Sequence, residues 1–416
     1  MTFKFSHIAD SHIGAWREPK MRQLSIDAFI TAINLSIKRK VDFVLISGDL
    51  FNTAIPDIES IKSAVSSLNK LKKSGISCYI IPGSHDFSPN GKTFLEVIEE
   101  AGLVINTNKA SILDGKLKLK FTVDDKTGAR ITGIAGKRGQ LDKRDYELVD
   151  YTDIEKYQGF KIFMFHTTIT ELKPKSMDFL ESFPISFLPI SFNYYAGGHV
   201  HIVKDFCSEH YKNVVYPGPL FPNSFSELEK LKHGGFYIVE AEENSKVLKK
   251  EFIPINLKEV CLLEINADSM SSEKLSEELQ NRIKDTENKF DDTIVLLRVY
   301  GTLSFGKISD INFSSIIESI YQKNAYFVMR NTSKLSTQDS LLASKNELNS
   351  ADDIESDVIT ENVGTREHNF INESKAIWDI MHVASSSKLD GEKVYDYESR
   401  IISEIDATIE SNKKEE

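Results

Sequence analysis

Five short motifs hold the aspartate, serine and histidine residues whose types and spacing could do chemistry, and each follows a strand-like apolar run. In chain order they are Asp10-Ser11-His12, Gly48-Asp49, Gly83-Ser84-His85-Asp86, His166 and Gly198-His199-Val200-His201. In open α/β sheets, the loops at the carboxyl ends of the strands converge on one crevice. We therefore expect the motifs to meet in space, although they lie far apart in the sequence.

The residue types suit a pair of divalent metal ions. Two ions held about 3.5–4 Å apart can polarise a phosphate and generate a hydroxide nucleophile at neutral pH. Such a site needs a carboxylate that bridges both ions, with imidazole and further carboxylate ligands. Asp49, which follows its strand behind a glycine, is the natural bridge. Asp10 and His12 lie two residues apart and can hold one ion from the same side of an extended loop.

The histidines of the last two motifs complete the expected site. His199 and His201 share the two-residue spacing and can be divided between the ions, while His166 would serve the second ion. Each motif alone has an ordinary explanation, because Gly-Asp suits a turn and a single histidine can be a satisfied core residue. Their joint occurrence, in order and each after a strand, favours the metal site.

His85 has a different expected role. It lies between Ser84 and Asp86 in a loop led by a glycine, beside the expected ions. A protonated imidazole there could stabilise developing charge or protonate the leaving oxygen. The alternative is a histidine that only orients the loop.

The elements that would position these motifs alternate between strands and helices. Residues 43–46 form a continuous apolar run, typical of a strand buried on both faces. Residues 26–37 and 58–71 carry apolar side chains at helical spacing. Strands dominate from about residue 112 onward, and the first of them is expected at 117–123. We therefore expect an α/β (α+β) fold built on a β-sandwich flanked by helices.

The chain divides into four expected parts. The parts are a first domain at 1–255, a small α+β domain at 256–332, a linker rich in Ser, Asn, Asp and Glu at 333–365, and a helical tail at 366–416. The tail stripe of Val394, Tyr397, Ile401, Ile405 and Ile409 indicates an amphipathic helix. We expect this helix to dock on a partner rather than to form a core of its own.

Composition narrows the setting. The formal net charge is −11, but most of the acidity lies in the tail, so the first domain remains able to approach phosphates. Three widely spaced cysteines favour a reducing compartment without disulfides. We find no signal-like segment and no apolar run long enough to span a membrane, so we expect a cytoplasmic protein.

The motifs resemble those of the calcineurin-like metallophosphoesterase superfamily. Residues 7–14, 47–51 and 215–219 make the sequence similar to the DNA double-strand-break repair branch, the SbcD-type and meiotic recombination nucleases, and to their archaeal kind. The resemblance covers about residues 1–250. The second domain resembles the capping domain of that family, and the tail resembles the helices that bind an SMC-like ABC ATPase.

The resemblance implies a ligand set and an activity. One ion would bind Asp10, His12, Asp49 and His201, and the other Asp49, Ser84, His166 and His199, with His85 as the catalytic histidine. It implies Mn²⁺ and ATP-independent cleavage of DNA, as a single-strand endonuclease and a duplex-end exonuclease. It also implies a nucleoid-associated homodimer, joined through helices near the second and third motifs, that works with the ATPase.

Two positions depart from the family pattern. Ser84 replaces an asparagine ligand, and its shorter hydroxyl would hold the second ion more loosely. Asn52, which we place among the substrate-binding residues, replaces a histidine, and this change would impair one cleavage step. Both departures keep open a scaffold for DNA ends that does not cut. A phosphodiesterase of small molecules is a second alternative, against which the added domain, linker and tail argue, because a small substrate does not require them.

A loop at residues 136–144 offers a candidate contact with DNA. Lys137 and Arg138 lie between glycines, which allow close backbone approach to phosphates. The alternative is an ordinary solvated charged loop.

Overall fold

The computed structural model describes residues 2–88, 91–137, 141–177, 181–242, 248–338, 373–386, 388–389 and 394–412. By its contacts the chain divides into two compact units. The first comprises residues 1–266, 276–299 and 312–333, and the second comprises residues 267–275, 300–311 and 334–416. The expected division into four parts remains a prediction.

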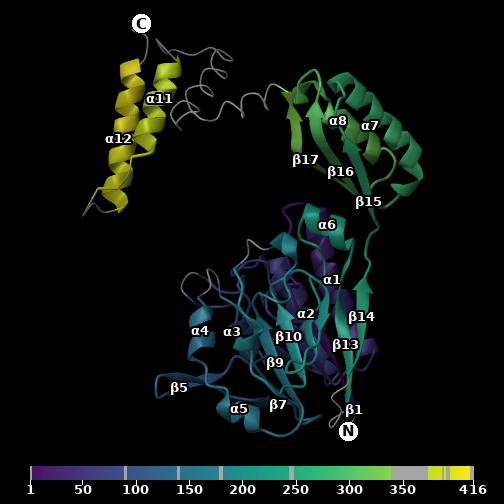
Figure 1. Ribbon diagram of the computed structural model, residues 1–416, viewed down its shortest axis with the longest axis vertical. Helices are drawn as coiled ribbons and strands as arrows, with labels where there is room; N and C mark the ends of the chain where they lie inside the picture. The colour runs from purple at the N-terminus through teal and green to yellow at the C-terminus, as the bar shows by residue number, and fades with distance from the viewer. Residues whose placement is uncertain are drawn as a thin grey trace. The chain divides into compact units, whose positions relative to one another are not determined.

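The first of two six-stranded sheets has the order β14-β13-β1-β2-β3-β4. Its strands β1, β13 and β14 are labelled in Figure 1. Its strands are β1 (Thr2–Ile8), β2 (Phe43–Ser47), β3 (Ser77–Ile81), β4 (Ile105–Asn106), β13 (Gly234–Glu242) and β14 (Lys249–Ile255). The four strands β1 to β4 run parallel, while β13 and β14 join antiparallel at the β1 side. The carboxyl ends of β1, β2 and β3 therefore lie at one edge of the sheet.

The second sheet has the order β11-β12-β10-β9-β8-β7. Its strands are β7 (Thr122–Val123), β8 (Arg130–Ile134), β9 (Lys161–His166), β10 (Tyr194–Gly198), β11 (Lys204–Phe206) and β12 (Val214–Tyr216). The strands β8, β9, β10 and β12 run parallel, with antiparallel strands at both edges. A separate hairpin joins β5 (Ala110–Leu113) to β6 (Lys116–Leu119).

The two sheets pack face to face through one hydrophobic core. Its members come from both sheets and include Phe5, Phe43, Leu45, Tyr79, Ile162, Met164 and Tyr194. On β2, Phe43 and Leu45 face this core, whereas Val44 and Ile46 face the opposite side. Burial on both faces is the reason that residues 43–46 are continuously apolar.

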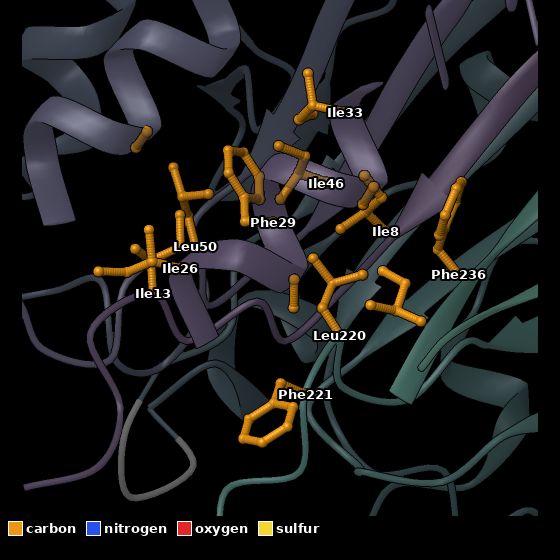
Figure 2. Packing of buried hydrophobic residues seen from close by; sticks show 14 of the residues in the cluster. Ile8, Ile13, Ile26, Phe29, Ile33, Ile46, Leu50, Leu220, Phe221 and Phe236 are labelled. Carbon is orange, nitrogen blue, oxygen red and sulfur yellow. The ribbon is translucent and has the colours of Figure 1, made fainter. Parts of the chain in front are cut away.

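Helices cover the outer face of the first sheet. They are α1 (Pro19–Lys38), α2 (Ile58–Lys73) and the shorter α3 (Leu95–Glu100). Phe29 and Ile33 of α1 pack with Ile8 and Ile46 of the sheet (Figure 2). On the outer face of the second sheet, a third cluster includes buried residues of α4 (Lys143–Leu148) and α5 (Thr152–Lys156).

A three-stranded sheet follows the sandwich in sequence. Its order is β15 (Val260–Asn266), β16 (Ile294–Leu303), β17 (Phe327–Thr337), with α7 (Ser272–Thr286) and α8 (Phe313–Tyr321) in the connections. Within the described residues, 3₁₀ turns lie at Lys175–Met177, Ile185–Phe187, Glu287–Lys289 and Ile308–Asp310.

In the second unit, α11 (Glu373–Ala384) packs against α12 (Val394–Asn412). The Tyr397 hydroxyl donates to the carbonyl of Ser386 at 3.0 Å. The apolar stripe of the tail is half-buried at Tyr397, Ile401, Ile405 and Ile409, so the predicted helix is not alone. Most of the predicted linker lies outside the described residues. None of the helices described is long and apolar enough to cross a membrane.

The predicted α/β sandwich flanked by helices is confirmed. One local expectation was wrong: the apolar stretch 117–123 is not a single strand. It is split into β6, which pairs within the hairpin, and β7, which pairs with β8 in the second sheet. The sequence pattern does not distinguish one strand from two short strands with different partners.

Candidate metal centre

All five motifs lie at the carboxyl ends of parallel strands, where the two sheets meet. β1 and β2 lead into the loops of Asp10, His12 and Asp49, while β9 ends at His166 itself. The backbone N–H of His12 donates to the carbonyl of Asp49 at 3.0 Å, which fixes the first two loops together. Residues from both sheets thus face one shared space.

Asp49 lies at the centre of the arrangement. Its Oδ2 is 3.1 Å from His166 Nε2 and 3.6 Å from His12 Nε2. Burial alone would raise the pKa of Asp49, but the charge of His166 and its hydrogen bond outweigh burial and hold that pKa below its usual range. Burial likewise opposes the charge on His166, yet Asp49 raises the pKa of His166 to about 10. The two groups form a buried ion pair.

A second group of side chains surrounds Asp10. His12 Nε2 and His201 Nε2 are 3.1 Å apart, and His201 Nε2 is 4.0 Å from Asp10 Oδ1. Burial lowers the pKa of His12 to about 3, so its imidazole is neutral, the form that binds metals. Asp10 Oδ2 and His12 Nδ1 are buried without a hydrogen-bond partner in the described part of the chain.

These donors fit divalent cations. Ligand atoms lie within 4.8 Å of one another in three overlapping groups, namely Asp10–His12–His201, His12–Asp49–His85 and Asp10–Asp49–His166. Carboxylate and imidazole donors suit Mn²⁺, Zn²⁺ and related ions. Asp10 Oδ2 lacks a hydrogen-bond partner among the described residues, and the Nε2 atoms of His12 and His201 face each other. A cation bound between these three atoms would satisfy all of them.

The other two expected ligands lie at the margin. Ser84 is buried in the loop after β3, next to His85. The side chain of His199 is exposed, although its ring centroid lies 5.1 Å from that of His166. The backbone N–H of His199 donates to Asp10 Oδ1 at 2.8 Å. His199 therefore contributes through its backbone whether or not its ring binds an ion.

His85 is oriented by two hydrogen bonds. Its backbone N–H donates to Asp49 Oδ1 at 2.8 Å, and its Nδ1 donates to the carbonyl of Asn52 at 2.9 Å. The ring centroid is 4.9 Å from that of His12. The proton on Nδ1 leaves Nε2 as the reactive nitrogen. Asn52 acts here through its backbone, so the replacement of a histidine at this position leaves the contact intact.

Comparison with known proteins agrees with this geometry. Residues 3–203 match the model of the calcineurin-like phosphoesterase family. This part of the chain is a calcineurin-like phosphoesterase domain.

Several archaeal relatives share more of the chain than this domain. The DNA double-strand break repair protein Mre11 of Methanococcus maripaludis is 26% identical over 353 residues, 77% of this chain and 90% of that relative. The proteins of the same name from Archaeoglobus fulgidus and Methanocaldococcus jannaschii are 27% and 29% identical. They align with 64% and 61% of this chain and with 62% and 69% of their own length. The family and these relatives confirm the predicted resemblance and the enzyme class, a metal-dependent phosphodiesterase.

Glycines make the phosphoesterase site possible. Gly48 has φ +87°, and a Cβ there would lie 2.1 Å from His166 Nδ1. A Cβ on Gly198 would lie 2.1 Å from the carbonyl oxygen of Ser47, which accepts the hydrogen bond from His166 Nδ1. The two glycines therefore allow the two sheets to approach closely around the His166 ring.

Four expected ligands of the phosphoesterase domain have left-handed backbones. Their φ angles are +48° at Asp10, +41° at His12, +51° at Asp49 and +91° at His199. Such conformations cost of order 1–3 kcal/mol each and cluster at functional sites. The surrounding fold holds these residues in positions that relaxed loops would avoid.

Three supporting residues were not predicted from the sequence. Asp86 accepts from the backbone N–H groups of Gly83 and Phe51, and burial together with the charge of Asp49 raises the pKa of Asp86 to about 7. His7 of β1 is buried and hydrogen-bonded to Tyr194 and Ser47. Asp86 is part of the third motif and His7 lies three residues before the first, but the sequence does not show where either side chain points.

The third is Glu227, whose Oε1 is 3.0 Å from His201 Nδ1. A signal for it exists in the sequence, because Ser224 followed three residues later by a glutamate is typical of a helix start. That signal predicts the helix and gives no indication of the histidine.

The proposed DNA loop is only partly described. Lys137 Nζ lies 2.5 Å from Asp145 Oδ2, so its charge is already paired within the domain. Arg138 lies outside the described residues.

Proposed function

We propose that this chain is a Mn²⁺-dependent nuclease of DNA double-strand-break repair that cleaves single strands internally and trims duplex ends. The observation that carries the proposal is the set of aspartates and histidines from both sheets, whose ligand atoms lie within 4.8 Å of one another around Asp10 and Asp49. The archaeal relatives, which are double-strand break repair proteins by name, support DNA as the substrate.

We assign the ligands as two sets that share Asp49. The first set is Asp10, His12, Asp49 and His201, and the second is Asp49, Ser84, His166 and His199. Two bound ions would supply positive charge at the phosphodiester and an acidified water at neutral pH. The 3.1 Å approach of His12 Nε2 to His201 Nε2 supports the first set. The central place of Asp49 supports its bridging role.

His85 is the proposed catalytic histidine. Because Nδ1 is bound to the carbonyl of Asn52, a protonated ring presents its second N–H through Nε2. That N–H would donate to a phosphate oxygen or protonate the leaving oxygen. The proposed substrate contacts remain Asn52, Lys137 and Arg138. Lys137 would first have to break its ion pair with Asp145.

The wider assembly is part of the proposal. Large apolar side chains are exposed at Ile55 just before α2, at Ile58 in α2 and at Val97 in α3, which supports a homodimer through these helices. The paired helices α11 and α12, with exposed Met381 and Ile402, support docking of an SMC-like ABC ATPase. We retain the four predicted parts of the chain and a nucleoid-associated, cytoplasmic location as part of this proposal.

The decisive experiment is cleavage of circular single-stranded DNA with Mn²⁺, comparing the native chain with Asp49→Asn and His85→Ala. We expect native cleavage, no cleavage or Mn²⁺ binding at the shared position in Asp49→Asn, and no cleavage with retained Mn²⁺ binding in His85→Ala. A matched control is His210→Ala, because His210 is exposed and belongs to none of the ligand-atom groups.

If the native chain does not cleave the DNA, the proposal is rejected as it stands. In that case Ser84→Asn separates the remaining explanations. Restored cleavage would indicate that the serine holds the second ion too loosely. Continued absence of cleavage together with tight DNA binding would favour a scaffold. Cleavage of bis-p-nitrophenyl phosphate without action on DNA would favour a small-molecule phosphodiesterase.

A further inference from the structure

The carboxylate of Glu227 is divided between two tasks. Oε1 accepts from Nδ1 of His201 at 3.0 Å, and Oε2 accepts from the backbone N–H of Asn223 at 2.8 Å. Glu227 lies in the first turn of α6 (Phe225–Leu231), and the helix is capped by the Ser224 hydroxyl. One oxygen therefore holds the start of the helix, and the other holds a proposed metal ligand.

The bond to His201 fixes which ring nitrogen faces the site. Because Nδ1 carries the proton donated to Glu227, Nε2 is left as the electron-pair donor, and it points to His12 Nε2 and Asp10 Oδ1. Carboxylates that hold the remote nitrogen of a metal-binding histidine fix its tautomer and ring orientation. His201 is half-buried, so protein packing alone leaves part of its surface open to solvent.

A helix-capping role alone does not explain this geometry. In a capping box, the glutamate at the third helical position turns back to the N–H of the N-cap residue. Here Oε2 reaches Asn223, one residue before the cap, and Oε1 points away from the helix to His201. Capping would be served without the second contact.

Helix α6 is itself anchored. Leu228 is fully buried in the core against the first sheet, and Glu229 is paired with Arg298 of β16 at 2.5 Å. The guanidinium of Arg298 also lies 5.1 Å from the ring centroid of Phe225. Glu227 therefore projects from a fixed support rather than from a mobile loop.

We propose that Glu227 is a positioning residue that orients His201 for metal binding. The inference rests on the proposed function, because it assumes that His201 is a ligand, and it adds a residue that acts through that ligand. Nothing else among the described side chains hydrogen-bonds Nδ1 of His201.

The test is calorimetric titration of the full chain with Mn²⁺. We expect Glu227→Ala to weaken binding of one ion about 10–100-fold, the usual effect of removing such a partner. Glu227→Gln should bind with intermediate affinity, because its amide oxygen can still accept from Nδ1 while its NH₂ group cannot accept from Asn223. Partial rescue by glutamine is a result that general loosening of the helix would not give.

Two control variants separate positioning from helix effects. Glu229→Ala removes a paired glutamate from the same helix, and Ser224→Ala removes the cap while leaving Glu227 in place. Both should bind Mn²⁺ as the native chain does, with folding checked by thermal melting. If either weakens binding as much as Glu227→Ala, or if Glu227→Ala binds as the native chain does, the inference is overturned. A native chain that binds no Mn²⁺ would overturn the proposed function as well.

Discussion

At the residue scale, the site is built from conformations that ordinary side chains avoid. Gly48 shows this most directly, because its φ is +87° and its missing Cβ leaves room for His166. Around it, Asp10, His12 and Asp49 have left-handed backbones without the freedom of glycine. The fold stabilises them only because loops from both sheets hold them on either side.

Gly48→Ala should therefore destabilise the chain through strain and collision together. Gly115→Ala is the matched control, since Gly115 has φ +74° in the β5–β6 turn and open space where a Cβ would lie. We expect Gly115→Ala to cost about 1–2 kcal/mol and Gly48→Ala about 1–3 kcal/mol more. Denaturant unfolding measures both. Equal losses would show that the contact with His166 costs nothing.

Mn²⁺ binding should weaken as the pH falls. The pKa of His166 is raised to about 10, so its ring is protonated at neutral pH, whereas a metal needs the neutral imidazole. Protons and metal therefore compete, and loss of one proton per ion gives an affinity that rises about tenfold per pH unit below the pKa. Titration calorimetry in two buffers of different ionisation enthalpy would detect the released proton. Constant affinity from pH 6 to 8 would contradict the ion pair with Asp49.

The sequence indicated which residues lie near one another more reliably than it indicated the backbone conformations and contacts that hold them there. Six of the proposed site residues share ligand-atom groups in the structure, because each follows a strand whose end lies at the same edge. The left-handed backbones and the contact from Glu227 to His201 depend on segments far apart in the chain. No local pattern contains that information.

At the element scale, helix starts are stabilised by single side chains. Asp57 is the N-cap of α2, and its Oδ1 accepts from the backbone N–H of Ser60 at 2.9 Å. We expect Asp57→Ala to lower the free energy of unfolding by about 1 kcal/mol, whereas Asp57→Asn should retain most of it, because asparagine caps equally well. Thermal and denaturant melts of the pair give the comparison. A similar loss in both variants would point to the charge of Asp57 instead of its cap.

Strands and helices were predicted best where their burial gives the sequence a clear apolar pattern. Residues 43–46 were predicted correctly as a strand because both faces of β2 are covered. The short helices α4 and α5 were not predicted, and α11 was predicted only as part of the helical tail. Each of these helices is short or depends on packing against a neighbouring element. Tertiary packing rather than local periodicity therefore stabilises it.

At the scale of the whole molecule, the proposed dimer depends on apolar side chains that one chain leaves exposed. Ile58 at the start of α2 is 83% exposed. We expect Ile58→Glu to shift the mass measured by light scattering from dimer to monomer, because a charge would be buried without a partner. Ile112→Glu in the β5–β6 hairpin, at 79% exposure, is the control and should leave the mass unchanged. A monomeric native chain would reject the proposed interface.

The origin of the ligands on two different sheets has a consequence for folding. Asp10, His12 and Asp49 follow strands of one sheet, while His166, His199 and His201 belong to the other. An ion bound by ligands from both sheets would link the two sheets to each other. It would have no equivalent site in the unfolded chain. At one hundred times its Kd, such a ligand adds about 2.7 kcal/mol of stability. A chelator should therefore lower the melting temperature of the native chain and leave that of Asp49→Asn nearly unchanged, so that the catalytic ions also act as cross-links of the fold.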